Sequence, residues 1–216
     1  MTIRKLVPLF TVAAAVLAIL TAAPFAAPPP SDPPFWTGQG AAGQATAGPI
    51  MLEADSLRVL RCTSGEAMPR KLAEDGYAEP GVFTGDMSLQ WHDASGPGAV
   101  LELEFPVQIP GRYSVAVRVA KYRAYGIHQF AVGNIPLGKP VDMFGNPGQD
   151  IVTAFTVELG AVHMVAGVHR LVIRVVGTNP DTIMANYGAG LDWLRLTPVP
   201  VPGRDGSGVR SPAFEK

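Results

Sequence analysis

Cysteine is nearly absent from this 216-residue chain, in which Cys62 is the only one. A single cysteine excludes an intrachain disulfide bond and any zinc site built from several thiolates. Charged residues are also few, at 16% of the chain, and their formal net charge is −1. This balance gives no reason to expect nucleic acid or an anionic membrane surface as a partner.

The short motifs of common hydrolases are missing as well. The chain contains neither a Gly-x-Ser-x-Gly nucleophile elbow nor a His-Glu-x-x-His metal motif. Glu102 and Glu104 stand two apart on the polar face of one predicted strand, whereas the carboxylates of a glycosidase normally face each other across a cleft. We therefore do not predict an enzyme.

The first 27 residues have the pattern of an export signal. Arg4 and Lys5 precede an apolar run from Leu6 to Leu20, and small residues follow it. Prolines interrupt the cleavage pattern, so residues 1–27 are either a signal peptide or an uncleaved N-terminal membrane anchor. Either alternative predicts a secreted, periplasmic or cell-surface protein. Residues 28–49, rich in Pro, Gly and Ala, are predicted to be a linker.

The rest of the chain alternates apolar and polar residues and is rich in turn-forming Gly and Pro, typical of an all-β antiparallel sandwich. Residues 50–198 form the predicted domain, and 199–216 a disordered tail. Residues 63–86 are expected to be irregular. The predicted strands cover residues 50–52, 57–62, 87–91, 100–107, 112–122, 127–132, 135–141, 151–159, 170–176 and 191–197.

Four segments of the sequence are similar to segments of a known protein family. They are Leu-Glu-Ala-Asp (52–55), Phe-Pro-Val-x-x-Pro-Gly-Arg-Tyr-Ser-Val (105–115), Tyr-Gly-Ile-His-Gln-Phe (125–130) and Gly-Leu-Asp-Trp-Leu-Arg-Leu (190–196). Together they resemble carbohydrate-binding modules of the galactose-binding-like jelly-roll type. The segment 111–197 is similar to C-terminal β-sandwich accessory domains of bacterial glycoside-hydrolase-like proteins. The resemblance implies a jelly-roll fold and a glycan ligand.

The resemblance also implies a structural calcium ion between the first and last strands, with Glu53, Asp55 and Asp192 at the matching positions. Calcium prefers several oxygen ligands, and two carboxylates two residues apart in an extended strand point to one side. Asp192 is expected on the same face as Leu194 and Leu196, where a carboxylate needs a partner. The alternative is that Glu53 and Asp55 are solvated and that Asp192 caps a turn.

Sugar recognition needs aromatic faces with hydrogen-bonding groups beside them. The candidate sugar contacts are Trp91 with His92, Tyr122 and Tyr125 with His128, and Asn186 with Tyr187. Trp91 is alternatively a core tryptophan, and Tyr125 and His128 alternatively pack on the preceding strand.

The sequence thus predicts an exported, non-catalytic module that binds glycan or polysaccharide. The rival is a structural or protein-interaction domain that contacts other envelope proteins and binds no sugar. Membrane contact is expected only through an uncleaved N-terminal segment. Exposure of Trp91, Tyr122 and Tyr125 separates the two hypotheses, because burial of all three would favour the rival.

Overall fold

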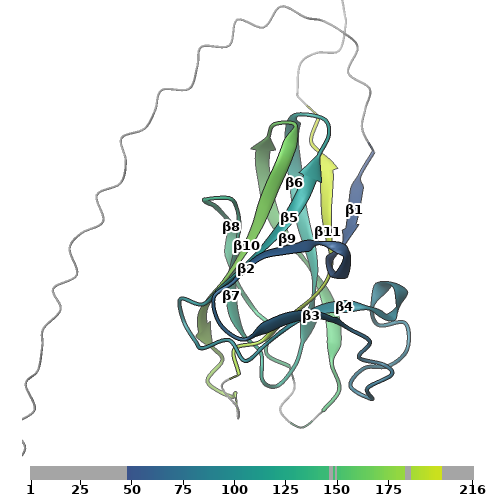
Figure 1. Ribbon diagram of the computed structural model, residues 1–216, viewed down its shortest axis with the longest axis vertical. Helices are drawn as coiled ribbons and strands as arrows, with labels where there is room; N and C mark the ends of the chain where they lie inside the picture. The colour runs from purple at the N-terminus through teal and green to yellow at the C-terminus, as the bar shows by residue number, and fades with distance from the viewer. Residues whose placement is uncertain (1–47, 146–147, 149, 183–185, 201–216) are drawn as a thin grey trace, which may run out of the picture. The chain divides into compact units, whose positions relative to one another are not determined.

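The computed structural model describes residues 48–145, 148, 150–182 and 186–200, which form two antiparallel β-sheets (Figure 1). One sheet has the order β3-β4-β11-β6-β9, with β1 also paired to β11, and the other has the order β2-β5-β10-β7-β8. The predicted all-β antiparallel sandwich is therefore confirmed. The strands are β1 (Ile50–Glu53), β2 (Arg58–Cys62), β3 (Glu66–Arg70), β4 (Ser88–His92), β5 (Val100–Val107), β6 (Gly111–Lys121), β7 (Gly126–Val132), β8 (Ile135–Asp142), β9 (Thr153–Met164), β10 (Gly167–Thr178) and β11 (Ala189–Pro198).

Helical structure within the described residues is limited to two 3-10 turns, η1 (Ala54–Ser56) and η2 (Thr84–Asp86). We find no helix in this part of the chain that is long and apolar enough to span a membrane. The predicted signal or anchor (1–27) lies outside the described residues, as do all but the last two residues of the predicted linker and all but the first two of the predicted tail.

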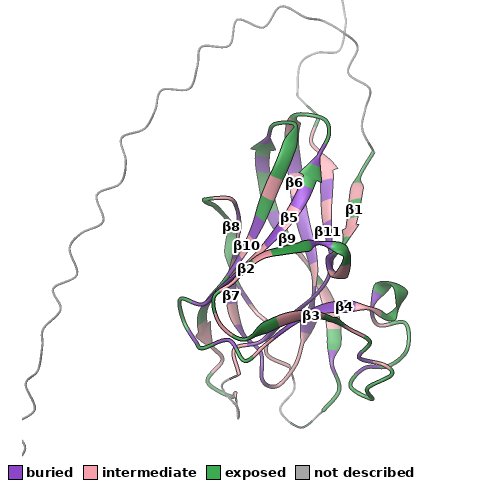
Figure 2. Ribbon diagram, viewed as in Figure 1, coloured by how far each residue is buried: buried purple, intermediate pink, exposed green. Residues whose placement is uncertain are grey.

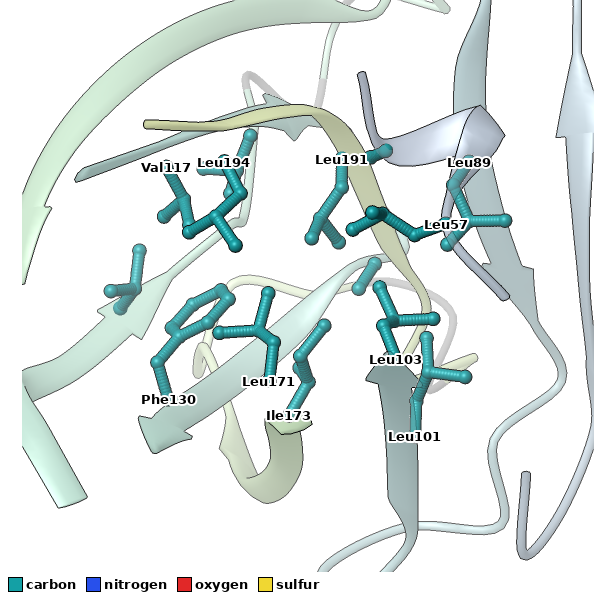
Figure 3. Packing of buried hydrophobic residues seen from close by; sticks show 14 of the residues in the cluster. Leu57, Leu89, Leu101, Leu103, Val117, Phe130, Leu171, Ile173, Leu191 and Leu194 are labelled. Carbon is teal, nitrogen blue, oxygen red and sulfur yellow. The ribbon is translucent and has the colours of Figure 1, made fainter. Parts of the chain in front are cut away.

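The core lies between the two sheets, because alternate residues of each strand point inward. Leu101, Leu103 and Phe105 of β5 are fully buried, whereas Glu102 and Glu104 between them are only half-buried. Figure 2 shows this alternation of buried and less buried residues along the strands. In Figure 3, Leu101, Leu103, Phe130, Leu171 and Ile173 of one sheet face Val117, Leu191 and Leu194 of the other.

Strand β11 is the centre of its sheet. One edge pairs with β6, while the other pairs first with β4, at Ala189–Leu191, and then with β1, at 193–196. The register with β6 shifts between Leu191 and Trp193, which marks a bulge. The bulge puts Leu191 and Leu194 both in the core and turns Asp192 to the outer face, toward Arg118. The expectation that Asp192 shares a face with Leu194 and Leu196 is therefore wrong.

The expectation of an irregular segment over residues 63–86 is also wrong in part. Residues Glu66–Arg70 form β3, which pairs with the whole of β4 at the edge of the sheet. Pro69 argued against a strand in the sequence, because proline removes one hydrogen bond of the ladder. It is tolerated here because β3 is an edge strand. The remainder, from Lys71 to Met87, is a long connection, and η2 lies near its end.

The sandwich has two ends with different roles. We call the end where β4, β6, β8 and β10 stop and β5, β7, β9 and β11 start the loop pole. The opposite end, formed by the tight turns at 108–110, 133–134 and 165–166, is the turn pole. Strand β6 runs from the turn pole at Gly111 to the loop pole at Lys121, about 33 Å at the usual rise of about 3.3 Å per residue.

Candidate functional site

A pocket of about 280 Å³ lies at the loop pole. Arg70 and His92, the last residues of β3 and β4, and the connections before β4, β7, β9 and β11 all contribute to it, so its walls come from segments far apart in the sequence. Four of the predicted ligand-binding residues meet there, namely His92, Tyr122, Tyr125 and Asn186. The other lining residues are Arg70, Leu72, Tyr77, Ala124 and Val152.

Three tyrosines form an edge-to-face row along this pocket. The ring centroids of Tyr77 and Tyr122 are 6.5 Å apart at an interplanar angle of 80°, and those of Tyr122 and Tyr125 are 5.5 Å apart at 66°. Such T-shaped pairs stabilise one another beyond the area they bury. Tyr77 is 43% exposed, Tyr122 is half-buried and Tyr125 is buried, so the row leads from solvent toward the core.

Tyr125 anchors the inner end of the row. Its hydroxyl donates to Oε1 of the buried Gln90, whose Nε2 donates to Oγ of Ser88 at 2.8 Å. Burial raises the pKa of Tyr125 well above its usual value, so the hydroxyl stays protonated at all physiological pH values. Tyr125 therefore offers a ring to the pocket, while its hydroxyl is committed to the protein.

Arg70 and His92 form the basic side of the pocket. Nη2 and Nε of Arg70 both contact Oδ2 of Asp75, at 2.5 and 3.1 Å. Burial, together with the charge of Arg70, lowers the pKa of His92, so its ring is neutral near pH 7. Among the described residues, Nε2 of His92 is buried without a hydrogen-bond partner. This nitrogen keeps an unused hydrogen-bonding capacity, which a ligand reaches when the ring turns toward the pocket.

Asn186 ties the last connection to the end of β4. Its Oδ1 accepts from the backbone N–H of Asp93 at 2.8 Å, and its Nδ2 donates to Oδ1 of Asp93 at 3.0 Å. Asp93 has φ of 55°, a left-handed conformation that Asp adopts more readily than most residues. The amide thus shapes the rim, and the second hydrogen on Nδ2 is its remaining donor.

The three remaining predicted contact residues do not line this pocket. Trp91 and His128 are both fully buried, and Nε1 of Trp91 donates to the Ser64 carbonyl at 2.8 Å. Tyr187 is half-buried outside the pocket, and its carbonyl lies 3.2 Å from Nε2 of His128. Trp91 and His128 are core residues rather than contact residues, because a bound sugar has no access to their rings.

The carboxylates of the predicted calcium site are arranged differently from the expectation. β1 ends at Glu53, which is exposed, and Asp55 lies in the turn η1, so the two do not share one strand. Asp192 is buried, and an ion pair joins its Oδ2 to Nε of Arg118 at 3.2 Å. Its Oδ1 accepts from the Thr84 N–H at 2.9 Å.

The Arg118 guanidinium is therefore the counter-charge of Asp192 in this structure. Within the described residues, no group of three or more His, Cys, Asp or Glu side chains could hold a metal. Burial nevertheless raises the pKa of Asp192, against the opposing effects of Thr84 and Arg118. Asp55 lies close enough to Asp192 to raise its pKa further, and Oδ1 of Asp55 is buried without a hydrogen-bond partner among the described residues. The calcium ion therefore stays a prediction from the resemblance.

Sequence reasoning missed five of the nine lining residues. Leu72, Ala124 and Val152 are apolar residues in connections, where no periodic pattern marks them. Arg70 belonged to the strand that was not predicted. Tyr77 could have been predicted as a surface aromatic residue, because it follows Gly76 in a segment without strand pattern, and such connecting segments lie on the surface. Its carbonyl accepts from the Val152 N–H at 2.6 Å, which joins two connections that the sequence alone does not pair.

Comparison with known proteins identifies the fold. No protein-family model matches the chain, and no curated protein matches it either. Among solved structures, a xanthan lyase from Paenibacillus has a TM-score of 0.59 at 19% identity, covering 76% of this chain. Only 14% of the lyase chain is covered, so the likeness concerns a small part of that protein and shows a shared fold.

Carbohydrate-binding modules are also among the structural neighbours. A family 35 module from Clostridium thermocellum has a TM-score of 0.47 at 14% identity, covering 71% of this chain and 100% of the module. A β-(1,4)-mannanase with such a module, from Podospora anserina, has a TM-score of 0.45 at 14% identity, covering 73% of this chain and 29% of the mannanase.

Proposed function

We propose that this protein is a non-catalytic jelly-roll module that binds glycan in the loop-pole pocket. The observation that carries the proposal is the row of three tyrosines, which opens to solvent at Tyr77 and lies beside Arg70 and His92. Sugars present C–H faces that pack on aromatic rings, and hydroxyl groups that bond to amide, imidazole and guanidinium donors. The pocket offers both kinds of surface within one cavity.

The size of the pocket limits what it holds. At about 280 Å³ it is near the lower bound of ligand pockets, about 300 Å³. We infer that one sugar ring enters it, either as a chain end or as a side branch. The free face of Tyr77 and the half-buried Tyr122 are the stacking surfaces, while His92 Nε2 and Asn186 Nδ2 supply hydrogen bonds.

Two further observations support this proposal. A small part of a xanthan lyase has the fold of this chain, and that enzyme is named for its action on xanthan. Because only 14% of the lyase is covered, its activity is not transferred to this chain. The apolar N-terminal run after Arg4 and Lys5 is typical of exported proteins, which meet extracellular glycans. We propose accordingly that the protein is secreted, periplasmic or attached to the cell surface.

Burial of Trp91, Tyr122 and Tyr125 together would have favoured the rival hypothesis, an interaction domain without a sugar site. Two of these are buried, but Tyr122 is half-buried and lines the pocket together with the exposed Tyr77. The accessible aromatic surface at the loop pole is therefore made by Tyr77 and Tyr122 rather than by Trp91. This arrangement favours the glycan hypothesis.

Affinity electrophoresis in gels that contain a panel of neutral and acidic polysaccharides tests the proposal. We expect at least one polysaccharide to retard the wild-type protein. Tyr77→Ala should weaken that retardation about tenfold, because an aromatic contact worth about 1.4 kcal/mol is a factor of ten in affinity. Val176→Ala, which truncates an exposed residue outside the pocket, is the matched control and should behave as wild type. Equal retardation of all three proteins, or none across the panel, contradicts the proposal.

A further inference from the structure

The turn pole carries an unusual set of exposed apolar side chains. Ile109, Ile135, Val165 and Val168 are 41%, 53%, 63% and 65% exposed, and they come from three turns that lie side by side. The turns are adjacent because Gly167 pairs with Val107, Gly111 pairs with Met164, and the Gly133 N–H donates to the Arg170 carbonyl at 2.8 Å. Figure 2 shows exposed residues at these turns.

These side chains are displayed on a rigid frame. The Tyr113 hydroxyl donates to the Ile109 carbonyl at 2.6 Å, and Nε2 of His169 lies 2.8 Å from the Val165 carbonyl. The His169 ring stacks on Phe105, with the ring centroids 5.7 Å apart. A shallow hollow of about 360 Å³ lies between the turns, lined by Ile135, Val165 and Val168 together with His163, His169 and Arg170. Fixed backbone at these turns means that burying the apolar tips costs little conformational entropy.

The turns of this pole carry basic residues and no acidic ones, although Arg170 lies opposite Glu104 on the neighbouring strand. Residues 105–113, 132–137 and 159–170 contain no Asp or Glu, although they contain Arg112, Arg170 and two histidines. Arg170 reaches back to Glu102, 3.3 Å away, whereas no ion pair involves Arg112 among the described residues. Arg112 pairs in register with His163, so the two basic side chains are neighbours on one face. The net charge of −1 of the whole chain does not reveal this local separation of charge.

Both ends of the domain emerge at the same pole. Ile50, the first residue of β1, pairs with Leu196, and Pro198, the last residue of β11, pairs with Tyr113 at the start of β6 (Figure 1). In the sequence, the apolar run Leu6–Leu20 precedes Ile50 by 29 residues, a contour of at most about 100 Å. A tether of this length gives a high effective concentration of any membrane surface to which the run is attached.

We propose that the turn pole binds the surface of an anionic phospholipid bilayer. Ile109, Ile135, Val165 and Val168 enter the boundary between headgroups and acyl chains, and Arg112 contacts lipid phosphates. A second copy of the chain fits this pole less well, because two like-charged surfaces repel one another. The pocket at the loop pole, about 33 Å away along β6, then faces away from the bilayer and is free to bind.

The test uses the full chain with its N-terminal run retained, incorporated into vesicles of phosphatidylcholine and phosphatidylglycerol that carry doxyl-labelled lipid as quencher. With Cys62 replaced by Ser, an environment-sensitive dye is attached either through Val165→Cys at the turn pole or through Ser95→Cys in the connection after β4 at the loop pole. Both dyes share the same tether, so any difference between them reports how the domain is oriented. We expect quenching at position 165 to exceed quenching at position 95 severalfold.

Two further sets of measurements identify the interactions that hold the turn pole and the partner that it binds. Arg112→Glu reverses one charge and should make docking roughly thirtyfold less favourable, since each surface charge contributes about a factor of five. High salt or vesicles of phosphatidylcholine alone should act in the same direction, and Val168→Asp should abolish the quenching difference. Circular dichroism checks that each variant is folded. Equal quenching at the two positions, or no response to Arg112→Glu and Val168→Asp, overturns the proposal. A concentration-dependent blue shift at position 165 without vesicles identifies a second copy as the occupant, which also overturns it.

Discussion

His128 is a polar side chain placed in the core beneath the candidate site. Its ring centroid is 6.1 Å from that of Trp91, and its Nε2 lies 3.2 Å from the Tyr187 carbonyl in the connection before β11. Burial lowers the pKa of His128 to about 4, so the folded protein keeps this ring neutral where an unfolded chain would protonate it. A glycan-contact role was predicted from the sequence for His128, and its alternation with Phe130 in β7 explains why it is a core residue instead.

The depressed pKa of His128 predicts a specific dependence of stability on pH. The folded-state pKa of about 4 lies below the unfolded value of about 6.5, so the stabilisation is complete above pH 6.5 and is lost as the pH falls toward 4. The loss amounts to about 3 kcal/mol, at 1.36 kcal/mol per pKa unit. Urea unfolding of wild type and His128→Gln between pH 7 and pH 4 measures it. An equal slope in both proteins would show that His128 is not the responsible group.

At the scale of elements, β11 joins most of the molecule because it pairs with β1, β4 and β6. Its bulge sends Asp192 to the outer face, where Arg118 of β6 and Thr84 of η2 hold it. Nη2 of Arg118 also donates to the Val82 carbonyl at 2.8 Å, so the pair fixes the connection between β3 and β4 on the sheet. That connection carries Tyr77, which links this ion pair to the shape of the pocket.

Removing the cation should destabilise the fold, because it leaves a buried carboxylate without a counter-charge. We expect Arg118→Met to lower the free energy of unfolding by about 2 kcal/mol at pH 7, less than for a fully buried pair because Arg118 is about one-third exposed. Since the pKa of Asp192 is already raised by burial, the deficit should shrink as the pH falls and the carboxyl group becomes protonated. Urea unfolding at pH 7 and pH 4.5 measures this, with Arg118→Met/Asp192→Asn as the matched control. A deficit that does not change with pH would contradict the account.

At the scale of the whole molecule, the sequence predicted the sandwich because alternating strands such as β5 and β10 display their inner faces directly. It predicted four of the nine residues that line the pocket, His92, Tyr122, Tyr125 and Asn186, without showing that they lie together. Their meeting depends on connections that pack through backbone hydrogen bonds, such as Val152 to Tyr77, which no periodic pattern encodes. The face of Asp192 could not be predicted either, because one bulge residue inverts the alternation that follows it.

Calcium would bind between the first and last strands and would therefore stabilise the whole sandwich. The ion pair between Asp192 and Arg118, 3.2 Å apart, predicts no change in Tm between buffers that contain calcium and buffers that contain EDTA, whereas the resemblance predicts a rise. A bound ion at a concentration one hundredfold above its Kd would instead raise Tm by about 5 °C or more. Differential scanning calorimetry of the full chain distinguishes the two results, and a rise of that size would restore Glu53, Asp55 and Asp192 as ligands.

Amide NMR spectra recorded during titration with oligosaccharides give the sharpest test of glycan binding at the loop pole. We expect a bound oligosaccharide to shift the side-chain amide of Asn186 and the backbone amides of Tyr77, His92 and Tyr122. Amides of the turn pole, such as those of Val165 and Gly133, should not move. Shifts confined to the turn pole or to the outer faces of the sheets, or no shifts with any neutral or acidic oligosaccharide, would contradict it.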